Sequence, residues 1–418
     1  MNIRVAPSPQ AEAFSLAPSR NSLKIVHVIT RFVRGGADEN TLYSCNAQAA
    51  AGHKVCLIYG RDCSAEMLTR LDGGVEQICL PSLVRKIDPL NDMKALVTLA
   101  RELQRVQPDI VHTHTSKAGV LGRLAAFLID APTVVHGVHI VPFVNVGRAE
   151  RLIYLTLERL LAPVTDAFVS VSGEMRDLCI TSDVGSPPAH KVVPSGMDVA
   201  RFRHAAPVEA GEISAVFGPP RFGRHKLIVI AAALEPRKRI VEFLPVFARI
   251  AAQEPAARLA ILGEGIERLR ALDAIDRLGL EGKASLLGFR QDVEKWLASA
   301  DVCVFASEHE GLPRAVVQYV LASRPVVTTN LPGIDRVVHD GQNGFVTETD
   351  DLDAMADPIL RLLREPALAA KFAAYSSQLN LSAWSVENMM TSLDEVYRDA
   401  ADNRDVTRIE EGQLAWTL

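Results

Sequence analysis

Three cations lie together in the second half of the chain, in the segment LEPRKRIVEF. They are Arg237, Lys238 and Arg239, and they follow an apolar run where a helix is expected to begin. Cations at a helix N-terminus oppose the helix macrodipole, so an unneutralised cluster is unfavourable there. An anionic ligand would remove that conflict, and phosphate groups suit such a place. The segment therefore favours a phosphate-binding site over a solvated basic turn.

A second candidate, SEHEGLPRAVVQYVLASRPVV at 307–327, has an acidic turn ahead of a helix that is expected to start near Pro313. A carboxylate such as Glu310 is suited to bind sugar hydroxyls, and Gly311 lets the backbone approach a ligand. Gln318 lies two helical turns later on roughly the same side. The alternative is an acidic turn that only caps the helix. This loop is the strongest local signal of a binding site in the sequence.

Weaker candidates follow strands in the first half of the chain. The Gly35–Gly36 pair in RFVRGGADE allows close backbone approach, and the next helix offers N–H groups to an anion, although a tight turn explains the pair equally well. In HGVHIVPF, His136 or His139 could donate a hydrogen bond or exchange a proton, but such a histidine more often belongs to the core. His112 and His114 in HTHTSKAG are interpreted as structural, because no third metal ligand is evident near them.

The elements that must position these residues alternate along the chain. Short runs that are apolar on both faces are each followed by a Gly, Pro or Asp break and an amphipathic stretch, which is typical of parallel β-α-β units. The expected strands are 24–30, 54–59, 109–114, 133–139 and 167–172 in the first half, and 227–232, 257–263, 284–288, 301–307 and 325–329 in the second. The predicted fold is α/β, with two doubly wound, Rossmann-like parallel sheets. Ligands bind outside the carboxyl ends of such strands, so two domains facing each other would form a cleft.

Changes of composition along the chain predict where these domains begin and end. The expected parts are a disordered tail (1–22), a first Rossmann-like domain (23–205), a linker rich in Ala, Pro, Gly and charge (206–224), a second Rossmann-like domain (225–380), a C-terminal helix (381–400) and a tail (401–418). In that last helix the apolar positions of WSVENMMTSLDEVY follow helical spacing, which indicates packing and not a cofactor site.

The composition excludes several classes of protein. A chain of 418 residues that is 48% hydrophobic and 23% charged has the size and apolar content of two globular domains. The balance of 45 Lys and Arg against 50 Asp and Glu argues against a dedicated nucleic-acid binder. No apolar run is long enough for a membrane-spanning helix, and the first 22 residues lack the apolar core of a secretory signal. Six scattered cysteines without a C-x-x-C motif suit a reducing compartment, so a cytoplasmic location is expected.

Taken together, these segments resemble the bacterial glycosyltransferases of family 4, which have the two-domain GT-B fold and retain the anomeric configuration. The resemblance runs from about Lys24 to Tyr397. It rests on GGADENTLYSCNAQAAAGHKV, HTHTSKAGVLGRLAA, VVHGVHIVPF, VVPSGMDVARF, LGEGIERLRAL, LLGFRQDVEKWLASADVCVFAS and SEHEGLPRAVVQYVLASRPVV. The resemblance implies transfer of a sugar from a UDP- or GDP-sugar to a glycan or polyprenyl-linked glycan during surface polysaccharide biosynthesis. It also implies that the C-terminal helix crosses back onto the first, acceptor-side domain.

The resemblance further implies roles for individual residues. Glycines Gly35 and Gly36 would approach the donor phosphate and the acceptor, and His139 would contact the donor sugar. Lys238 would neutralise the diphosphate, while Glu310 would meet the donor sugar. The remaining implied contacts to nucleotide, sugar and phosphate come from Arg290 near the base and from the backbone N–H groups of Gly311 and Leu312.

Two departures from the family pattern bear on activity. Gln318 replaces the second glutamate of the Glu-x7-Glu motif and loses its charge-assisted hydrogen bond to the ribose. Ala233 stands where an arginine usually binds phosphate, and Arg237 or Arg239 is the hypothetical substitute. These changes keep open the alternative of a non-catalytic GT-B partner protein that binds or stabilises another transferase.

No metal or other cofactor is expected, since no Asp-x-Asp motif for a divalent ion follows a strand. A basic face formed by Arg85, Lys86, Arg148, Arg151 and Arg159 predicts peripheral contact with the inner face of the cytoplasmic membrane, with solvated surface charges as the alternative.

Overall fold

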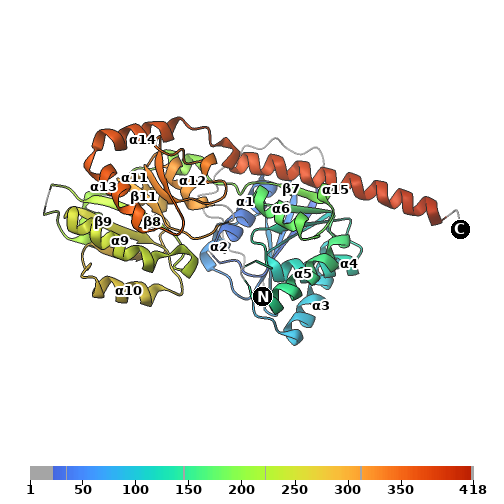
Figure 1. Ribbon diagram of the computed structural model, residues 1–418. Helices are drawn as coiled ribbons and strands as arrows, with labels where there is room; N and C mark the ends of the chain where they lie inside the picture. Colours follow the sequence, from blue (N-terminus) through green and yellow to red (C-terminus); the bar gives the residue numbers. More distant parts are fainter. Residues whose placement is uncertain (1–21, 34, 145, 222, 311–312, 416–418) are drawn as a thin grey trace. The chain divides into compact units, whose positions relative to one another are not determined.

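The computed structural model describes residues 22–415 apart from 34, 145, 222 and 311–312, and for 403–415 it describes the backbone only (Figure 1). The tail expected at 1–22 thus lies outside the described residues except for Ser22, and so do Gly311 and Leu312. The chain divides into two compact units. Unit 1 comprises residues 1–197 together with 383–418, and unit 2 comprises residues 198–382.

Unit 1 is a parallel sheet with helices on both faces. Its strands are β1 (Lys24–Ile29), β2 (Lys54–Gly60), β3 (Glu76–Leu80), β4 (Ile110–His114), β5 (Thr133–Val138), β6 (Ala167–Ser170) and β7 (His190–Val192), in the order β3-β2-β1-β4-β5-β6-β7. Its helices are α1 (Gly36–Ala50), α2 (Ala65–Thr69), α3 (Pro89–Val106), α4 (Ser116–Leu128), α5 (Arg148–Leu161), α6 (Gly173–Thr181) and α15 (Val386–Ala415).

Alternate side chains of the unit 1 strands point to different helices. Val26 and Val28 pack with α3 and α4 on one face of the sheet. Ile25 packs with α1 and α15 on the other face. His27, which lies between Val26 and Val28, therefore belongs to the face that α1 and α15 cover.

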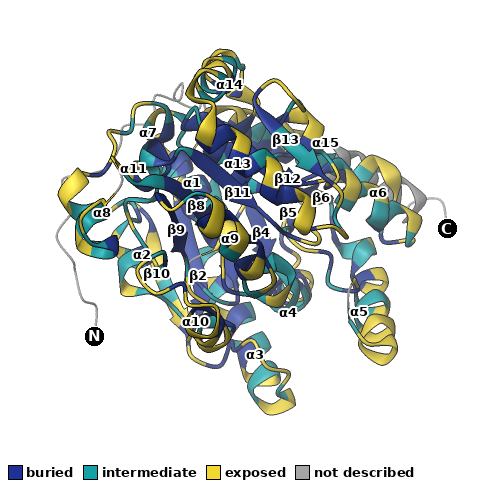
Figure 2. Cartoon of the chain, turned by 60° about the vertical axis from the view of Figure 1, so that its left-hand side comes forward, coloured by how far each residue is buried: buried dark blue, intermediate teal, exposed yellow. Residues whose placement is uncertain are grey.

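Unit 2 repeats this architecture. Its strands are β8 (Lys226–Ala231), β9 (Ala257–Leu262), β10 (Ala284–Gly288), β11 (Val302–Phe305), β12 (Val326–Thr329) and β13 (Gly344–Thr347), in the order β10-β9-β8-β11-β12-β13. Its helices are α7 (Val199–Arg203), α8 (Ala210–Phe217), α9 (Ile240–Gln253), α10 (Arg268–Arg277), α11 (Val293–Ser299), α12 (Arg314–Leu321), α13 (Ala356–Arg364) and α14 (Pro366–Gln378). Figure 2 shows the buried strands of both units in dark blue, beneath helices whose outer faces are exposed.

The prediction of two doubly wound parallel sheets is confirmed. In each sheet the strand order reverses at one place, between β1 and β4 in unit 1 and between β8 and β11 in unit 2. Ligands of doubly wound folds bind beyond the carboxyl ends of the strands at this switch point. These two places are therefore where functional side chains are sought.

Five segments differ from the expectation. The edge strands β3, β7 and β13 were not predicted, because short strands at a sheet edge lack the continuous apolar run of a central strand. The expected linker at 206–224 contains α8, which buries Phe217. The expected tail at 401–418 is helical as far as Ala415, since no proline interrupts the helix-forming residues after α15 leaves the core.

Candidate active site

At the switch point of unit 2, two cations and a carboxylate form one cluster. Arg237 and Lys238 follow β8 in a short 3-10 helix, Pro236–Lys238, and Glu310 follows β11. Arg237 Nη1 donates to Glu310 Oε1 at 2.5 Å, and Lys238 Nζ binds the same oxygen. The Glu308 N–H donates to the Arg237 carbonyl at 2.8 Å, which joins the two loops through their backbones. The loops that the sequence singled out are thus brought together.

The cluster lies in a largely buried position. The side chains of Lys238 and Glu310 are 11% and 10% exposed, and Lys238 Nζ lies 5.1 Å from the centre of the Phe305 ring. Burial lowers the pKa of Lys238, and Glu310 opposes that change. Charges so shielded from water act strongly on a bound anion, because the effective dielectric constant is low. Since both cations share Oε1, the other oxygen of Glu310 is suited to accept hydrogen bonds from hydroxyl groups.

The other residues predicted in unit 2 lie outside this cluster. Arg239, in the left-handed region with φ 56°, directs its guanidinium to the Thr349 carbonyl. Arg290 is held by Glu212 and Asp292, and Gln318 lies half-buried on α12. Of the two arginines proposed to replace the charge missing at Ala233, only Arg237 reaches Glu310.

In unit 1 the predicted glycine pair lies at the start of α1. Gly35 is the N-cap residue and Gly36 the first helical residue, and both are exposed. The first turn also carries the buried Asp38, and burial raises the pKa of its carboxyl group to about 7. A Cβ at Gly35 would lie 3.3 Å from Asp38 Oδ2. The sequence pattern does not single out this carboxyl group, because its burial depends on the fold of the loop.

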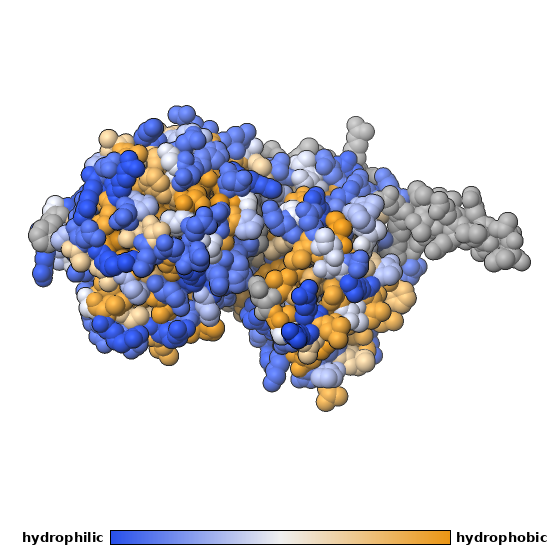
Figure 3. Space-filling model, viewed as in Figure 1, coloured by the Kyte–Doolittle hydropathy of each residue, from blue (hydrophilic) through white to orange (hydrophobic). Residues whose placement is uncertain are grey.

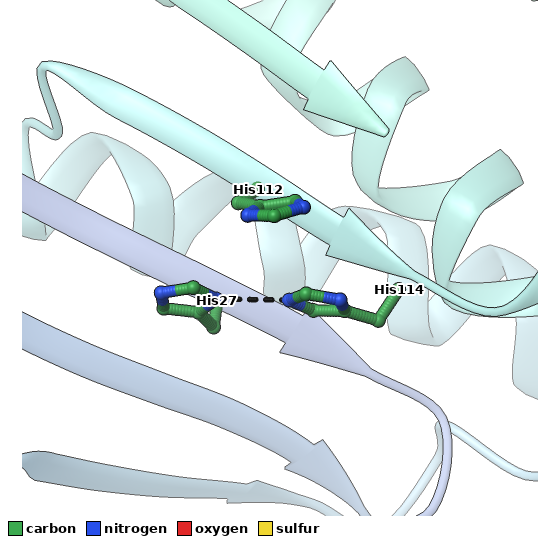
Figure 4. Close-up of side chains that lie close together, drawn as sticks. All are labelled: His27, His112 and His114. Carbon is green, nitrogen blue, oxygen red and sulfur yellow. Dashed lines mark hydrogen bonds between the residues drawn. The ribbon is translucent and has the colours of Figure 1, made fainter. Parts of the chain in front are cut away.

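Four histidines gather at the switch point of unit 1. His27 pairs in register with His112 across β1 and β4, and His114 lies two residues further along the same face. His27 Nδ1 and His114 Nε2 are 2.8 Å apart (Figure 4). His114 Nδ1 lies 3.0 Å from Nε2 of His139, which follows β5. His136 belongs to the opposite face, where its Nδ1 lies 2.9 Å from the Thr113 hydroxyl.

The sequence showed no third nitrogen near His112 and His114, but the fold supplies one from His27. One ligand nitrogen from each of these three side chains lies within 4.8 Å of the others. The separation of 2.8 Å between His27 and His114 is a hydrogen-bond distance. Two nitrogens on one tetrahedral zinc ion would lie about 3.4 Å apart, given Zn–N bonds of about 2.0–2.1 Å. The geometry is therefore that of a hydrogen-bonded group of imidazoles.

These imidazoles border a small cavity. It is lined by Asn40, Ser44, His112, His114, Gly137, His139, Val169, Val171, Val193, Met389 and Leu393. Two of the lining polar atoms, His112 Nε2 and Asn40 Oδ1, are buried without a hydrogen-bond partner among the described residues. The backbone of Gly137 lies close to the imidazole rings, since a Cβ there would lie 3.0–3.3 Å from nitrogens of His114, His139 and His112. A side chain at this position would crowd the imidazole group.

Known protein families match both units. A family described as "Glycosyl transferase 4-like domain" matches residues 35–196, and one described as "Glycosyl transferases group 1" matches residues 225–365. The two matches cover well over half of the chain. The chain belongs to the glycosyltransferases, with a 4-like domain in unit 1 and a group 1 domain in unit 2. The glycosyltransferase thus has its two candidate sites at the switch points of the two matched units.

Two curated relatives match most of the glycosyltransferase. The UDP-Gal:alpha-D-GlcNAc-diphosphoundecaprenol alpha-1,3-galactosyltransferase of Escherichia coli is 28% identical over 82% of this chain and 88% of its own. The phosphatidyl-myo-inositol mannosyltransferase of Mycolicibacterium smegmatis is 25% identical over 85% of this chain and 88% of its own.

Solved structures share the fold. Anabaena HepE in complex with UDP and glucose matches with a TM-score of 0.73 and 19% identity, over 89% of this chain and 98% of that one. A glycosyltransferase from Rickettsia africae matches with a TM-score of 0.74 and 17% identity, over 92% of this chain and all of that one.

Proposed function

We propose that this glycosyltransferase moves a sugar from UDP-sugar to a polyprenyl-diphosphate-linked glycan, with retention of the anomeric configuration and without a metal ion. The observation that carries the proposal is the group of Arg237, Lys238 and Glu310 at the switch point of unit 2. A nucleoside diphosphate offers anionic oxygens to the two cations, and the attached sugar offers hydroxyl groups to the carboxylate. The cations that would bind the diphosphate and the carboxylate that would bind the sugar are thus in direct contact with each other.

The proposed donor and acceptor follow the relatives. The Escherichia coli relative is named for a UDP-galactose donor and an acceptor on diphosphoundecaprenol, and the HepE structure contains UDP. We therefore choose UDP over GDP as the donor base. The acceptor class is a glycan built on a polyprenyl diphosphate, which suits assembly of a surface polysaccharide.

In the proposed reaction the bond between C1 of the sugar and the diphosphate oxygen breaks, and a bond from C1 to the acceptor oxygen forms on the same face. The departing phosphate takes the proton of the acceptor hydroxyl. Negative charge grows on the diphosphate in the transition state, and Lys238 and Arg237 stabilise it. Glu310 orients the sugar through its hydroxyl groups, and His139 contacts the sugar as the family resemblance implies.

A nucleotide-binding experiment tests the donor site. The melting temperature of the protein is measured with UDP, GDP and ADP, each at about 100 times its dissociation constant, where binding adds about 2.7 kcal/mol of stability. UDP should raise the melting temperature, and Lys238→Ala should abolish the rise. Lys371→Ala, which removes an exposed lysine of the same unit, is the matched control. A shift with GDP alone, or no shift with any nucleotide, would contradict the proposed donor.

Turnover separates a transferase from a non-catalytic partner. Gln318 and Ala233 are the residues that favour the partner, because each removes a charge that the family usually carries. Release of UDP that depends on a polyprenyl-diphosphate glycan supports transfer. Nucleotide binding without any turnover on such acceptors would favour the partner protein.

We also propose that unit 1 contacts an anionic membrane surface. Helices α3 and α5 both pack against α4, and both expose large apolar side chains. The most exposed of these are Leu90, Met93, Leu152, Ile153 and Leu160, and the exposed Ile87 lies just before α3. Figure 3 shows apolar side chains gathered over this part of unit 1. Among the described residues, no helix is both long and apolar enough to cross a bilayer.

Basic side chains accompany the apolar ones. Arg85 and Lys86 precede α3, and Arg148 and Arg151 begin α5, all exposed. Arg159 is already paired with Asp183, so it adds less to the predicted basic face. An apolar face flanked by cations is suited to the interface of anionic lipids.

Vesicle flotation tests this surface. The protein should bind vesicles that contain phosphatidylglycerol more strongly than vesicles of phosphatidylcholine alone. The double substitution Leu90→Glu with Leu152→Glu should weaken that binding at least several-fold. Leu269→Glu, at an equally exposed leucine of unit 2, should leave it unchanged. Equal loss in all variants would contradict a specific surface on α3 and α5.

A further inference from the structure

An unbroken series of hydrogen bonds joins α1 to His139 within unit 1. Gln48 Oε1 lies 2.7 Å from His27 Nε2, and His27 Nδ1 lies 2.8 Å from His114 Nε2. His114 Nδ1 in turn lies 3.0 Å from His139 Nε2. Every distance falls within the range of a normal hydrogen bond. We refer to Gln48, His27, His114 and His139 as the histidine chain.

The inner members of the histidine chain are uncharged at neutral pH. Gln48, His27 and His114 are each at most 1% exposed. Burial lowers the pKa of His27 to about 4, and it also holds the pKa of His114 well below the ordinary value of 6.5. A neutral imidazole has one N–H donor and one bare nitrogen. Each ring must therefore donate from one nitrogen and accept at the other.

The orientation of the Gln48 amide decides the direction of donation. Its carbonyl oxygen faces His27 Nε2, so His27 carries its proton on Nε2 and accepts at Nδ1. His114 must then donate from Nε2 to His27 and accept at Nδ1. His139 must donate from Nε2 to His114. Each proton position follows from the one before it.

A second bond of the same amide supports this orientation. Gln48 Nε2 lies 3.3 Å from the Tyr397 hydroxyl, while that hydroxyl lies 2.7 Å from His112 Nδ1. If the amide were turned over, its oxygen would accept from the Tyr397 O–H at 3.3 Å, beyond the usual limit of about 3.0 Å for O–H donors. With the amide as it stands, Tyr397 donates through the short bond and accepts through the long one.

We propose that Gln48 sets the tautomer of His139, acting through His27 and His114 as positioning residues. Neutral His139 then holds its proton on Nε2, and its Nδ1 can act only as a hydrogen-bond acceptor. This nitrogen can accept a hydrogen bond from a hydroxyl group. A carbonyl oxygen is disfavoured there, because the nitrogen has no proton to donate to it. The histidine chain also orients the plane of the His139 ring, because both ring nitrogens of His114 are engaged, Nε2 by His27 and Nδ1 by His139.

The consequence for catalysis rests on the proposed function, in which His139 contacts the donor sugar. In that role a lone pair on Nδ1 selects and orients a sugar hydroxyl. The tautomer itself does not depend on the proposed function, so the two are tested separately.

Nuclear magnetic resonance of the full chain with nitrogen-15-labelled histidine tests the tautomer. Chemical shifts of the ring nitrogens distinguish a protonated nitrogen from a bare one, and a His139→Gln variant identifies the His139 signals. We expect the proton on Nε2 and bare Nδ1 for His27, His114 and His139 near pH 8. A proton on His139 Nδ1 with bare Nε2 would overturn the proposal, whatever the activity of the protein.

Substitutions at Gln48 test its control over His139. Gln48→Leu removes the acceptor and should give His139 a mixture of tautomers, with kcat for transfer reduced several-fold more than KM is raised. Gln48→Glu keeps an oxygen that accepts from His27 and should restore the wild-type tautomer. Gln104→Leu, at an exposed glutamine of α3, should change neither signal nor kcat.

The outcomes separate the two proposals. An unchanged His139 tautomer in Gln48→Leu would overturn control by Gln48, even if that variant is less stable. If Gln48→Leu does not fold, the wild-type spectrum and Gln48→Glu still decide. A wild-type protein that shows the expected tautomer but no transfer would leave the tautomer assignment in place and contradict the proposed function.

Discussion

The Tyr397 hydroxyl lies 2.7 Å from His112 Nδ1, although 285 residues separate the two in the chain. Their rings meet edge to face, with centroids 5.7 Å apart at 86°. Tyr397 comes from α15 and His112 from β4, and both side chains are buried. The last helix of the chain is thus bonded to the central strands of unit 1, next to the histidine chain.

Removing this hydroxyl should destabilise unit 1. Tyr397→Phe leaves His112 Nδ1 without its donor and Gln48 Nε2 without its acceptor, and buried polar groups left unpaired cost about 1–3 kcal/mol. Denaturant unfolding followed by circular dichroism measures the loss. Tyr375→Phe removes a comparable bond to His339 at a half-buried place in unit 2, and it should cost less. Equal stability of Tyr397→Phe and the wild type would contradict the buried bond.

A methyl group at Gly137 should disturb the imidazole group. The added Cβ of Gly137→Ala would lie 3.0–3.3 Å from three ring nitrogens, so His112, His114 or His139 must move. We expect a lower melting temperature and at least a tenfold loss of transfer rate. Gly173→Ala, where an added Cβ meets no atom within 4 Å, is the matched control. Transfer at the wild-type rate in Gly137→Ala would show that the geometry of these rings is unimportant.

Nucleotide affinity should fall at alkaline pH. Burial lowers the pKa of Lys238, so its ammonium group loses its charge at a lower pH than an ordinary lysine. Binding of UDP, measured by calorimetry, should therefore weaken as the pH rises from about 7 to about 10, the upper limit being near the ordinary lysine pKa. Lys238→Arg retains its charge over this range and should show a flatter profile. Parallel profiles for the two proteins would exclude Lys238 as the titrating group.

Mild acid should destabilise the protein. Burial lowers the pKa of His27 to about 4 and the pKa values of His112, His114 and His136 well below 6.5. Between these values and 6.5 the unfolded chain binds more protons than the folded one, so the unfolding free energy falls as the pH decreases. Asp38 and Asp394 oppose this trend, because burial raises the pKa of both carboxyl groups, that of Asp38 to about 7, but the four buried histidines outnumber them.

Calorimetric melting temperatures at about pH 7.5 and about pH 5 measure this acid effect, which follows from the titration of the buried imidazoles. The value at the lower pH should be smaller. His27→Gln should reduce the difference, whereas His309→Gln, at an exposed histidine, should not. A higher melting temperature in acid would show that the buried imidazoles do not control the stability.

The predictability of the fold differs between central and edge strands. Central strands such as β8 and β11 are buried on both faces, so their sequences contain continuous apolar runs, LIVIA and VCVF, that stand out. The edge strand β3 reads EQICL and is mostly exposed, and β7 has only three residues. These edge strands form because a neighbouring strand supplies hydrogen bonds, and the local sequence contains no pattern that predicts this pairing.

The site in unit 2 was largely predictable, and the site in unit 1 was not. Lys238 and Glu310 each follow an apolar strand in a loop with its own chemical signature, so a phosphate site and a sugar-binding carboxylate could be proposed there, and the family resemblance implied the individual role of each residue. His27 lies inside a strand among valines and isoleucines, where a histidine is normally a core residue. Nothing near it in the sequence points to Gln48 or His139.

The sequence by itself determined the alternation of strands and helices, the two-unit α/β fold and the loops that carry charge, because these depend on local apolar periodicity and on residues close in the chain. Only the tertiary structure decided which of the predicted cations reaches Glu310 and that His27, His112, His114 and His139 meet. Such contacts depend on strand order and register. Those are set by the packing of whole elements, and residues as far apart as Gln48 and Tyr397 become neighbours only once that packing is complete.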